Sequence, residues 1–343
     1  MTHASDTTAP ARLLVAIVNY RTPQLTIDCL ESLVAEVCAL GSVRVVVVDN
    51  GSADGSAERI ASAIERGGWG SWASLIARPD NGGFSSGNNT AIRPALAAPE
   101  GPPQYVLLLN SDTRVLPGAL GALLDFMDAH PTVGIAGSRL EHPDGRVQNS
   151  RFRFHSVWSE LDSGLRIGLV SRLLKNYVVA QAPCDGFEPA DWVAGASMIV
   201  RSQVFRDVGL LDEGYFLYFE EVDFCLNARR AGWSCWYVPG STVVHLVGRS
   251  TGITNREVAQ VRRPRYWFES RRRYFAKNHG RAYALCADLA WAAGFAVWRV
   301  RRVVQGKPDP DPPRFLWDFV RHTSRAAWRG STPALSERAR SAP

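Results

Sequence analysis

Short apolar segments alternate with amphipathic segments along the first third of the chain, and polar residues follow each apolar segment. Residues 13–19, 43–48 and 105–109 have the length and the aliphatic composition of buried strands. Residues 23–36 and 57–64 alternate with them and have the pattern expected of helices. Strand–helix alternation of this kind favours a parallel sheet built from βαβ units. We therefore expect an α/β protein with a mostly parallel, Rossmann-like sheet flanked by helices.

Length and composition are those of a folded globular protein. The 343 residues, 46% of them hydrophobic, can bury a large core in one enlarged α/β domain or in two ordinary domains. None of the six cysteines forms a C-x-x-C pair and most lie in apolar segments, so we expect reduced, buried thiols and a cytosolic location. The N-terminus has no secretory-signal pattern. Residues 1–11 and 331–343 are expected to be flexible tails.

The basic character of the chain is concentrated near its C-terminus. Between Arg249 and Lys307 there are 14 lysines and arginines against 3 acidic residues, whereas the net charge of the whole chain is only +6. We expect no nucleic-acid partner, because an aromatic and apolar run lies within this basic segment. The basic segment instead indicates a helical extension over residues 256–330.

The apolar run at residues 283–300 allows two interpretations. It contains Trp291, Phe295 and Trp298 and lies between two arginine clusters, which suits a helix at the interface of an anionic membrane. A core helix that covers the sheet domain and has solvated arginines at its ends is equally compatible. A transmembrane span is disfavoured, because Asp288 interrupts a run that is already shorter than a bilayer requires.

Asn110, Ser111 and Asp112 follow the strand at residues 105–109. Asp112 would then lie at the carboxyl end of a parallel strand, the rim where open α/β sheets bind ligands. Magnesium and manganese prefer oxygen ligands and commonly take one or two protein carboxylates, with substrate phosphate and water completing the shell. Taken alone, the tripeptide is also compatible with a simple turn before a helix that starts within residues 113–119.

Two further segments have the composition of a nucleotide or diphosphate site. Asp49 ends the second strand and can accept a hydrogen bond from a base or a ribose, and glycines follow it in the next turn. Arg78, Asn81 and the Gly82-Gly83 pair supply a cation and a flexible backbone rich in donors. No G-x-G-x-x-G motif follows the first strand, so a dinucleotide-binding dehydrogenase is disfavoured.

An acidic cluster follows later in the chain. Glu220, Glu221 and Asp223 lie immediately before a segment, residues 226–231, that we expect to be helical. Repulsion between neighbouring carboxylates raises at least one pKa, which favours a general base, although acidic residues also stabilise helix N-termini. His245 follows a strand-like run and could complete a metal site.

The order of the motifs is more specific than any one of them. Seven motifs occur in succession: Val18-Asn-Tyr20, Val48-Asp-Asn-Gly-Ser-Ala-Asp-Gly-Ser56, Asn81-Gly-Gly-Phe-Ser-Ser-Gly-Asn-Asn89, Leu109-Asn-Ser-Asp-Thr113, Asp191-Trp-Val-Ala-Gly-Ala196, Tyr218-Phe-Glu-Glu-Val-Asp-Phe-Cys225 and His245-x-x-Gly-x-Ser250. Over about residues 12–280 this succession resembles the family 2 glycosyltransferases, in particular their bacterial rhamnosyltransferase-like branch. The resemblance implies a GT-A fold. Its catalytic domain would span residues 12–255, with a nucleotide-sugar half at 12–112 and an acceptor half at 113–255.

The resemblance also implies roles for individual residues. Asp112 would be the metal-binding Asp of a D-x-D-like motif, and His245 a second ligand of the metal or the diphosphate. Glu221 stands where the family has its inverting base, usually an Asp, and Asp223 is the alternative base. Asp49 would contact the nucleoside. The other implied residues of the nucleotide-sugar site are Asn19, Arg78, Asn81, Asn88 and Asn110, and those facing the sugar and acceptor are Trp192, Gly195, Ala196 and Glu220.

The implied activity is an inverting sugar transfer that depends on Mg²⁺ or Mn²⁺. The donor would be dTDP-L-rhamnose, and the acceptor a hydroxyl of a glycan or lipid-linked glycan in the synthesis of cell-surface polysaccharide. Other UDP- or GDP-sugars remain open as donors, as does a catalytically silent sugar-nucleotide-binding protein. A nucleotidyltransferase is disfavoured, because residues 19–23 lack the glycine-rich loop of that class. We expect a cytoplasmic enzyme, with membrane contact through residues 271–302 as an alternative to a purely soluble state.

Overall fold

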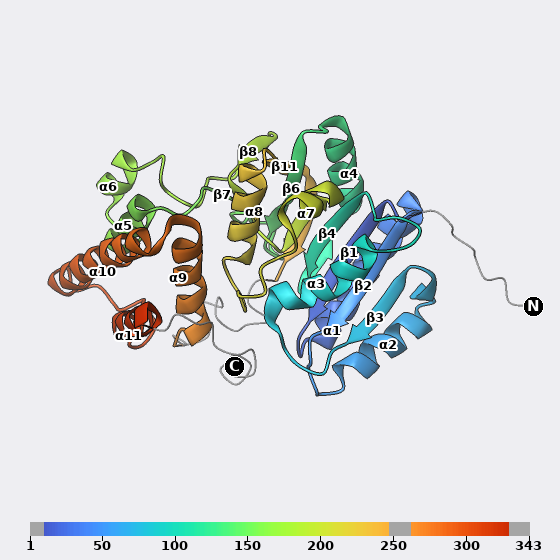
Figure 1. Ribbon diagram of the computed structural model, residues 1–343, viewed down its shortest axis with the longest axis horizontal. Coiled ribbons are helices and arrows are strands. Elements are labelled where there is room, and N and C mark those ends of the chain that lie inside the picture. Colours follow the sequence, from blue (N-terminus) through green and yellow to red (C-terminus); the bar gives the residue numbers. More distant parts are fainter. Residues whose placement is uncertain (1–9, 247–261, 329–343) are drawn as a thin grey trace, which may run out of the picture.

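The computed structural model describes residues 10–246 and 262–328 (Figure 1). A nine-stranded sheet forms its centre, and strands adjacent along its main path follow the order β3-β2-β1-β4-β10-β6-β11-β5. The first four of these strands are all parallel to one another. They are β1 (Leu13–Asn19), β2 (Val43–Asp49), β3 (Ala73–Ala77) and β4 (Tyr105–Asn110). The parallel arrangement expected from the strand–helix alternation is therefore confirmed in this half.

The second half of the sheet is mixed. β10 (Ser197–Arg201) runs antiparallel between β4 and β6 (Val133–Glu141). β11 (Ser234–His245) is parallel to β6 and antiparallel to the short strands β5 (Thr113–Val115) and β8 (Glu188–Ala190). A separate two-stranded sheet joins β7 (Arg151–Phe152) to β9 (Trp192–Val193). The antiparallel β5–β11 pair matters most for function, because it joins two distant motifs.

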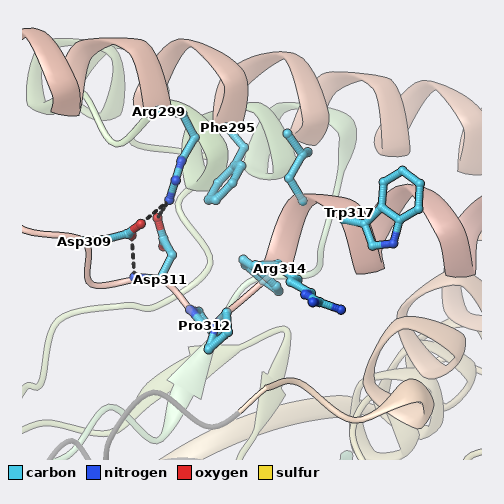
Figure 2. A pocket seen from close by; sticks show the side chains of 10 residues that line it. Phe295, Arg299, Asp309, Asp311, Pro312, Arg314 and Trp317 are labelled. Carbon is cyan, nitrogen blue, oxygen red and sulfur yellow. Dashed lines mark hydrogen bonds and ion pairs between the residues drawn. The ribbon is translucent and has the colours of Figure 1, made fainter.

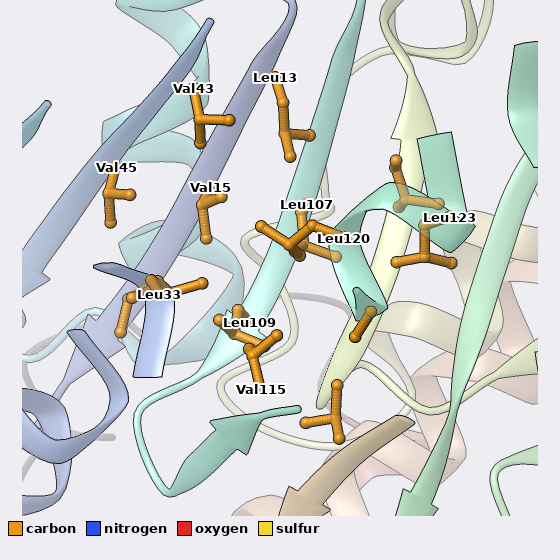
Figure 3. Close-up of a cluster of buried hydrophobic side chains, with 14 of the residues drawn as sticks. Leu13, Val15, Leu33, Val43, Val45, Leu107, Leu109, Val115, Leu120 and Leu123 are labelled. Carbon is orange, nitrogen blue, oxygen red and sulfur yellow. The ribbon is translucent and has the colours of Figure 1, made fainter. Parts of the chain in front are cut away.

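Helices cover both faces of the sheet because successive strand residues point to opposite sides. Leu13 and Val15 of β1 pack with α1 (Pro23–Leu40), α2 (Ser56–Arg66) and α4 (Ala119–Ala129), as Figure 3 shows for part of this core. Leu14 and Ala16 face the other layer, which contains α3 (Gly83–Leu96), α7 (Ser202–Val208) and α8 (Glu220–Arg230). The carboxyl ends of β1, β2 and β4 therefore lie between two helical layers.

Five helices form a helical lobe at one end of the molecule (Figure 1): α5 (Val157–Leu165), α6 (Gly168–Leu173), α9 (Arg265–His279), α10 (Arg281–Val304) and α11 (Phe315–Trp328). A third hydrophobic core lies between α9, α10 and α11 and includes Trp291, Phe295 and Trp298. The aromatic residues of the 283–300 run are thus core residues, as the core-helix interpretation requires, and they do not form a membrane face. None of the described helices is long and apolar enough to span a bilayer.

Several local expectations need correction. Residues 113–119 begin with strand β5, and the helix starts only at Ala119. No helix was expected directly after residue 82, but α3 begins at Gly83. α8 begins at Glu220, so the acidic cluster lies inside its first turn. β3 and the short 3₁₀ helix at Trp69–Ser71 were not expected.

The cysteines form no disulfides, and parts of the chain ends lie outside the described residues. All six cysteines are free, as expected, but Cys38 and Cys286 are exposed rather than buried. Gly248 and Ser250 of the last motif lie outside the described residues. So do the boundary at residues 255 and 256, the tail at 331–343 and most of the tail at 1–11.

Candidate active site

Asp112 and His245 meet at the carboxyl end of β4. β5 follows Asp112 directly and pairs antiparallel with β11, placing His245 opposite Thr113. His245 Nε2 lies 3.4 Å from Asp112 Oδ1 and 3.5 Å from Asn110 Nδ2. The two motifs are far apart in sequence, yet the structure brings together all three residues that the sequence assigned to this position.

Gln148 fixes the orientation of the His245 ring. Its Nε2 donates to the His245 carbonyl oxygen at 2.7 Å, which leaves its Oε1 facing His245 Nδ1 at 3.3 Å. An amide oxygen can only accept, so this contact requires a proton on Nδ1, and in the neutral ring the lone pair then belongs to Nε2, on the side of Asp112. A neutral imidazole nitrogen beside a carboxylate oxygen is a suitable ligand pair for a divalent cation.

The ligand set at this position is incomplete by itself. Within residues 10–246 and 262–328, no group of three His, Cys, Asp or Glu side chains is arranged to hold a metal ion. Asp112 and His245 could supply two ligands, and the remaining positions would be taken by substrate oxygens and water. Divalent magnesium and manganese sites at diphosphates have this character.

Asp49 is buried at the end of β2 and is held by its neighbours. Its Oδ1 accepts hydrogen bonds from Asn19 Nδ2 and Ser52 Oγ, both at 2.6 Å. The other end of the Asn19 amide accepts from Thr22 and Thr26, so Asn19 is fully bonded within the protein. Asn19 therefore positions Asp49, and its own assignment to the nucleotide-sugar site stays a prediction.

The turn into α3 is well ordered by side-chain contacts. Asn81 Oδ1 accepts from Asn50 Nδ2 and from the Gly83 N–H, each at 2.9 Å. Arg78 Nη1 donates to Ser86 Oγ at 2.7 Å, linking the end of β3 to the first turns of α3. Gly83 has a φ of +84°, a conformation that favours glycine. Their assignment to the nucleotide-sugar site stays a prediction.

Asn88 is buried in α3, and only one end of its side-chain amide forms a hydrogen bond. Its Nδ2 donates to the Phe84 carbonyl at 3.0 Å, and its Oδ1 has no hydrogen-bond partner. An unpaired buried acceptor is uncommon, which makes this oxygen available to a donor that enters the site.

Glu220 and Glu221 begin α8 after an unusual turn. Tyr218 and Phe219 both have left-handed backbone conformations, with φ of +71° and +69°. Such conformations cost energy in residues other than glycine and are concentrated at functional sites. One carboxylate oxygen of each glutamate is buried without a partner. Burial raises the pKa of Glu221 to about 7, and burial together with the Glu221 charge raises the pKa of Glu220.

Asp223 has a different environment. Its carboxylate receives hydrogen bonds from Lys277 Nζ and Asn278 Nδ2, each at 2.6 Å, and from the Tyr215 hydroxyl at 3.2 Å. The carboxylate is buried and its charge is compensated by the lysine. Asp223 is thus suited to anchoring α8, whereas Glu221 has an oxygen free to accept a proton.

The turn between β9 and β10 links the two carboxylate centres. The Ala196 carbonyl accepts from the Asn110 N–H at 3.0 Å. A Cβ placed on Gly195 would lie 3.8 Å from Glu221 Cβ and 3.6 Å from the Phe84 ring. Gly195 and Ala196 therefore connect the end of β4 to the first turn of α8, and their assignment to the acceptor side stays a prediction.

Trp192 lies deeper than a substrate-facing residue would. Its ring stacks on Phe152 at a centroid distance of 4.1 Å, and its Nε1 donates to the Arg153 carbonyl at 2.9 Å. The side chain is mostly buried. Its assignment to the sugar and acceptor side remains a prediction, and its observed contacts support the β7–β9 pair.

Sequence reasoning missed the supporting residues of the site. Gln148, Ser52 and Lys277 orient His245, Asp49 and Asp223 respectively. Ser52 stands within the Asp49 motif and could have been recognised by its Asx-turn spacing. Gln148 and Lys277 act across long sequence separations, and no local pattern marks them.

Family models cover the elements that build this site. One described as glycosyl transferase family 2 matches residues 14–182, and one described as glycosyl transferase family group 2 matches residues 105–320. The chain belongs to glycosyltransferase family 2. The resemblance inferred from the seven motifs is therefore confirmed, and the protein is a transferase enzyme.

Named relatives place this glycosyltransferase in the rhamnosyltransferase-like branch. It is 31% identical over 219 residues to the Mycobacterium tuberculosis protein named N-acetylglucosaminyl-diphospho-decaprenol L-rhamnosyltransferase, covering 61% of this chain and 68% of the relative. It is 44% identical over 55 residues to the Escherichia coli rhamnosyltransferase WbbL, covering 16% of this chain and 21% of that one.

Solved structures confirm the GT-A fold of the glycosyltransferase. The Pyrobaculum calidifontis mannosyltransferase PcManGT, in complex with GDP-Man and Mn²⁺, superposes with a TM-score of 0.55 at 15% identity, covering 94% of this chain and 82% of that chain. S. aureus TarS 1–349 superposes with a TM-score of 0.51 at 15% identity, covering 91% and 80%. At this level of identity the likeness concerns the fold alone.

Proposed function

We propose that this glycosyltransferase transfers L-rhamnose with inversion from dTDP-L-rhamnose to a hydroxyl of a lipid-linked glycan, as part of cell-surface polysaccharide synthesis. The observation that carries the proposal is the environment of the Glu221 carboxylate. Its buried carboxylate has one oxygen without a partner and a pKa raised by burial to about 7. A base with a pKa near the working pH is well suited to removing a proton from an acceptor hydroxyl.

The chemistry requires a single displacement. As the acceptor oxygen attacks the anomeric carbon, its proton passes to Glu221 and a carbon–oxygen bond forms. The bond between the anomeric carbon and the diphosphate oxygen breaks on the opposite side, which inverts the configuration. Gly195 stands beside Glu221 and adds no side chain there, so it leaves room for an acceptor near the base.

Asp112 and His245 are the residues that would hold Mg²⁺ or Mn²⁺. A cation bound there would neutralise the charge of the departing nucleoside diphosphate. Gln148 keeps His245 in the tautomer whose Nε2 lone pair faces Asp112. At the nucleotide end, Asp49 is held by Asn19 and Ser52 in a position suited to a nucleoside contact.

The names of the relatives support the choice of sugar and acceptor. The mycobacterial relative is named as an L-rhamnosyltransferase acting on N-acetylglucosaminyl-diphospho-decaprenol, and WbbL is named as a rhamnosyltransferase. Both names favour a rhamnosyl donor, and the first favours a lipid-linked acceptor. A protein that binds a sugar nucleotide without turnover is disfavoured by the free, buried carboxylate of Glu221.

The test is release of nucleoside diphosphate from dTDP-, UDP- and GDP-sugars, with and without an N-acetylglucosaminyl-diphospho-polyprenol acceptor. We expect release of dTDP from dTDP-L-rhamnose with Mg²⁺ or Mn²⁺, and none with EDTA. Asp112→Ala should reduce release to background. Asp185→Ala should retain full activity, because the Asp185 side chain is 97% exposed and pairs with Arg139, which is not a residue of the site.

Other results would change the assignment in defined ways. Release from a UDP- or GDP-sugar would replace the donor while leaving the reaction class intact. Release that is unaffected by EDTA and by Asp112→Ala would remove the metal from the proposal. Calorimetric binding of a donor without any release in the presence of acceptor would identify a silent binding protein.

A further inference from the structure

Exposed large hydrophobic side chains are distributed very unevenly over the described part of the molecule. Of the thirteen such side chains, twelve lie between residues 157 and 177 or in α10 and α11, all at the helical end of the molecule in Figure 1. Phe187 is the exception. Contiguous exposed apolar surface on one part of a protein marks an interaction site, whereas scattered single residues do not.

The outer face of α10 carries six of the thirteen side chains. Leu285, Leu289, Val297, Val300, Val303 and Val304 are between 48% and 80% exposed. Every other exposed position of this helix after Arg281 is alanine or cysteine. The 24-residue helix is about 36 Å long, so this face is an apolar stripe along its whole length. The opposite face is already used, because Trp291, Phe295 and Trp298 pack in the third core.

Several acidic side chains of the helical lobe are buried in ion pairs with arginines. Asp288 is buried 2.5 Å from Arg271, and Asp318 is buried 2.5 Å from Arg262. Asp311 is buried 2.8 Å from Arg166. Figure 2 shows Asp309 and Asp311 facing Arg299 in a hollow below the end of α10.

Cationic side chains stand at both ends of the stripe. Arg281 is exposed at the start of α10, and Lys307 is exposed just after its end. No acidic side chain is exposed along the helix between them. The outer face therefore combines apolar area with positive charge.

We propose that the outer face of α10 lies on the surface of a membrane leaflet that contains anionic lipid. An amphipathic helix binds such a surface through its apolar area together with attraction of its cations to the lipid headgroups. A second copy of the chain fits this face less well. An antiparallel pair would set Arg281 against the basic C-terminal end of the other helix, and a parallel pair would set each basic end against its equivalent. The inference does not depend on the donor or on the proposed catalysis.

Two exposed cysteines provide a direct test. Cys286 lies on the outer face of α10 and Cys38 lies on α1 of the sheet domain. The full chain would carry an environment-sensitive dye on one of them, with the other and Cys184 changed to serine. With vesicles of phosphatidylcholine and phosphatidylglycerol, the dye at Cys286 should shift to the blue, and the dye at Cys38 should not. Phosphatidylcholine alone should give a much smaller shift.

Flotation with the same vesicles tests the side chains. The double variant Leu289→Gln/Val300→Gln should lower the partition coefficient at least about tenfold, because both substitutions remove apolar area from the interface. Phe187→Gln is the matched control on the sheet domain and should bind like the wild type. Thermal unfolding and nucleoside diphosphate release without vesicles report whether each variant is folded.

Three results would overturn the inference. One is unchanged flotation of the double variant. Another is a blue-shifted dye at Cys286 before any vesicle is added, which would mean that protein already covers the face. The third is a change in sedimentation of the double variant without loss of vesicle binding, which would identify a contact between copies of the chain.

Discussion

At the scale of single residues, the two carboxylates within three positions of α8 have opposite roles because their surroundings differ. Glu221 is half-buried beside Glu220 and has one buried carboxylate oxygen without a partner, whereas Asp223 is bonded to Lys277, Asn278 and Tyr215. Burial without compensation favours the protonated form, and a nearby ammonium favours the charged form. The same acidic motif thus contains the proposed proton acceptor, Glu221, and a carboxylate, Asp223, that is bonded within the protein.

Glu221→Gln should reduce kcat by about 10²–10⁴-fold with little change in donor affinity, because a general base acts mainly in the transition state. In the wild type, kcat/KM should rise with pH through about 7 as Glu221 loses its proton. The pH profile of Glu221→Gln should be flat over that range. Single-turnover kinetics and donor calorimetry measure the two effects, and a variant with wild-type turnover would point to another proton acceptor.

Glu221→Gln, which should lower kcat, should raise the folding stability of the protein above pH 7. The pKa of Glu221 is raised in the folded state from 4.5 to about 7, so the folded protein binds the proton more tightly than the unfolded chain does. The stability of the wild type therefore falls as pH rises from 4.5 to 7 and stays lower above that. Glutamine does not ionise, so the stability of Glu221→Gln should not fall in this pH range for that reason. Its melting temperature should exceed that of the wild type at pH 8 and match it near pH 4, which calorimetry would show.

At the scale of elements, α5 and α10 cross with their backbones almost in contact. A Cβ on Gly164 of α5 would lie 2.6 Å from the Trp291 carbonyl oxygen, and one on Gly294 of α10 would lie 2.8 Å from the Leu161 carbonyl oxygen. Each helix therefore offers a glycine where the other passes. This crossing joins α5, which precedes β9 in the chain, to the C-terminal helices.

Gly294→Ala should destabilise the protein by about 1–3 kcal/mol, because the added methyl group meets backbone atoms that cannot move without separating the helices. Gly121→Ala in α4 is the matched control. It has open space around the new methyl group and should stabilise the protein by about 0.5–1 kcal/mol through the lower flexibility of alanine. Urea unfolding measures both, and equal effects of the two substitutions would contradict the close crossing.

At the scale of the whole molecule, ion pairs of α9 connect the helical lobe to α8 and to the loop before it. Lys277 bonds to Asp223 at 2.6 Å and to Asp212 at 2.8 Å, and Arg273 bonds to Asp212 at 2.9 Å. These contacts end two residues from Glu221. The lobe that carries the proposed membrane face is thus connected directly to the helix that carries the proposed base.

Lys277→Met should lower the free energy of unfolding by about 1–3 kcal/mol, because it leaves the buried Asp223 carboxylate without its cation. The loss should persist in high salt, since screening acts weakly on buried charges. Arg281→Met removes the same charge from an exposed position of the same lobe and should change stability little. Denaturant unfolding at low and high salt distinguishes the two, and similar losses in both variants would argue against a specific anchor.

Much of the parallel half of the fold could be predicted from the sequence. β1, β2 and β4 occur where the aliphatic runs indicated them, because a strand buried on both faces needs an unbroken run of apolar residues. β5 and β8 are three residues long and have no such signal. α3 was missed because its first turns contain glycine, serine and asparagine, which local propensity assigns to a loop.

The sequence by itself supplied the residues proposed for the site: Asp49, Asp112, Glu221 and His245 each lie at the end or the start of a strand or helix, within a motif that resembles the family. The tertiary structure alone decided their relations. The β5–β11 pair brings His245 next to Asp112. Asp223 forms an ion pair with Lys277, whereas one oxygen of Glu221 has no hydrogen-bond partner. The tertiary structure also turned the aromatic side of α10 inward and its aliphatic side outward. Periodicity reports which residues share a face of an element, but only packing decides what each face meets.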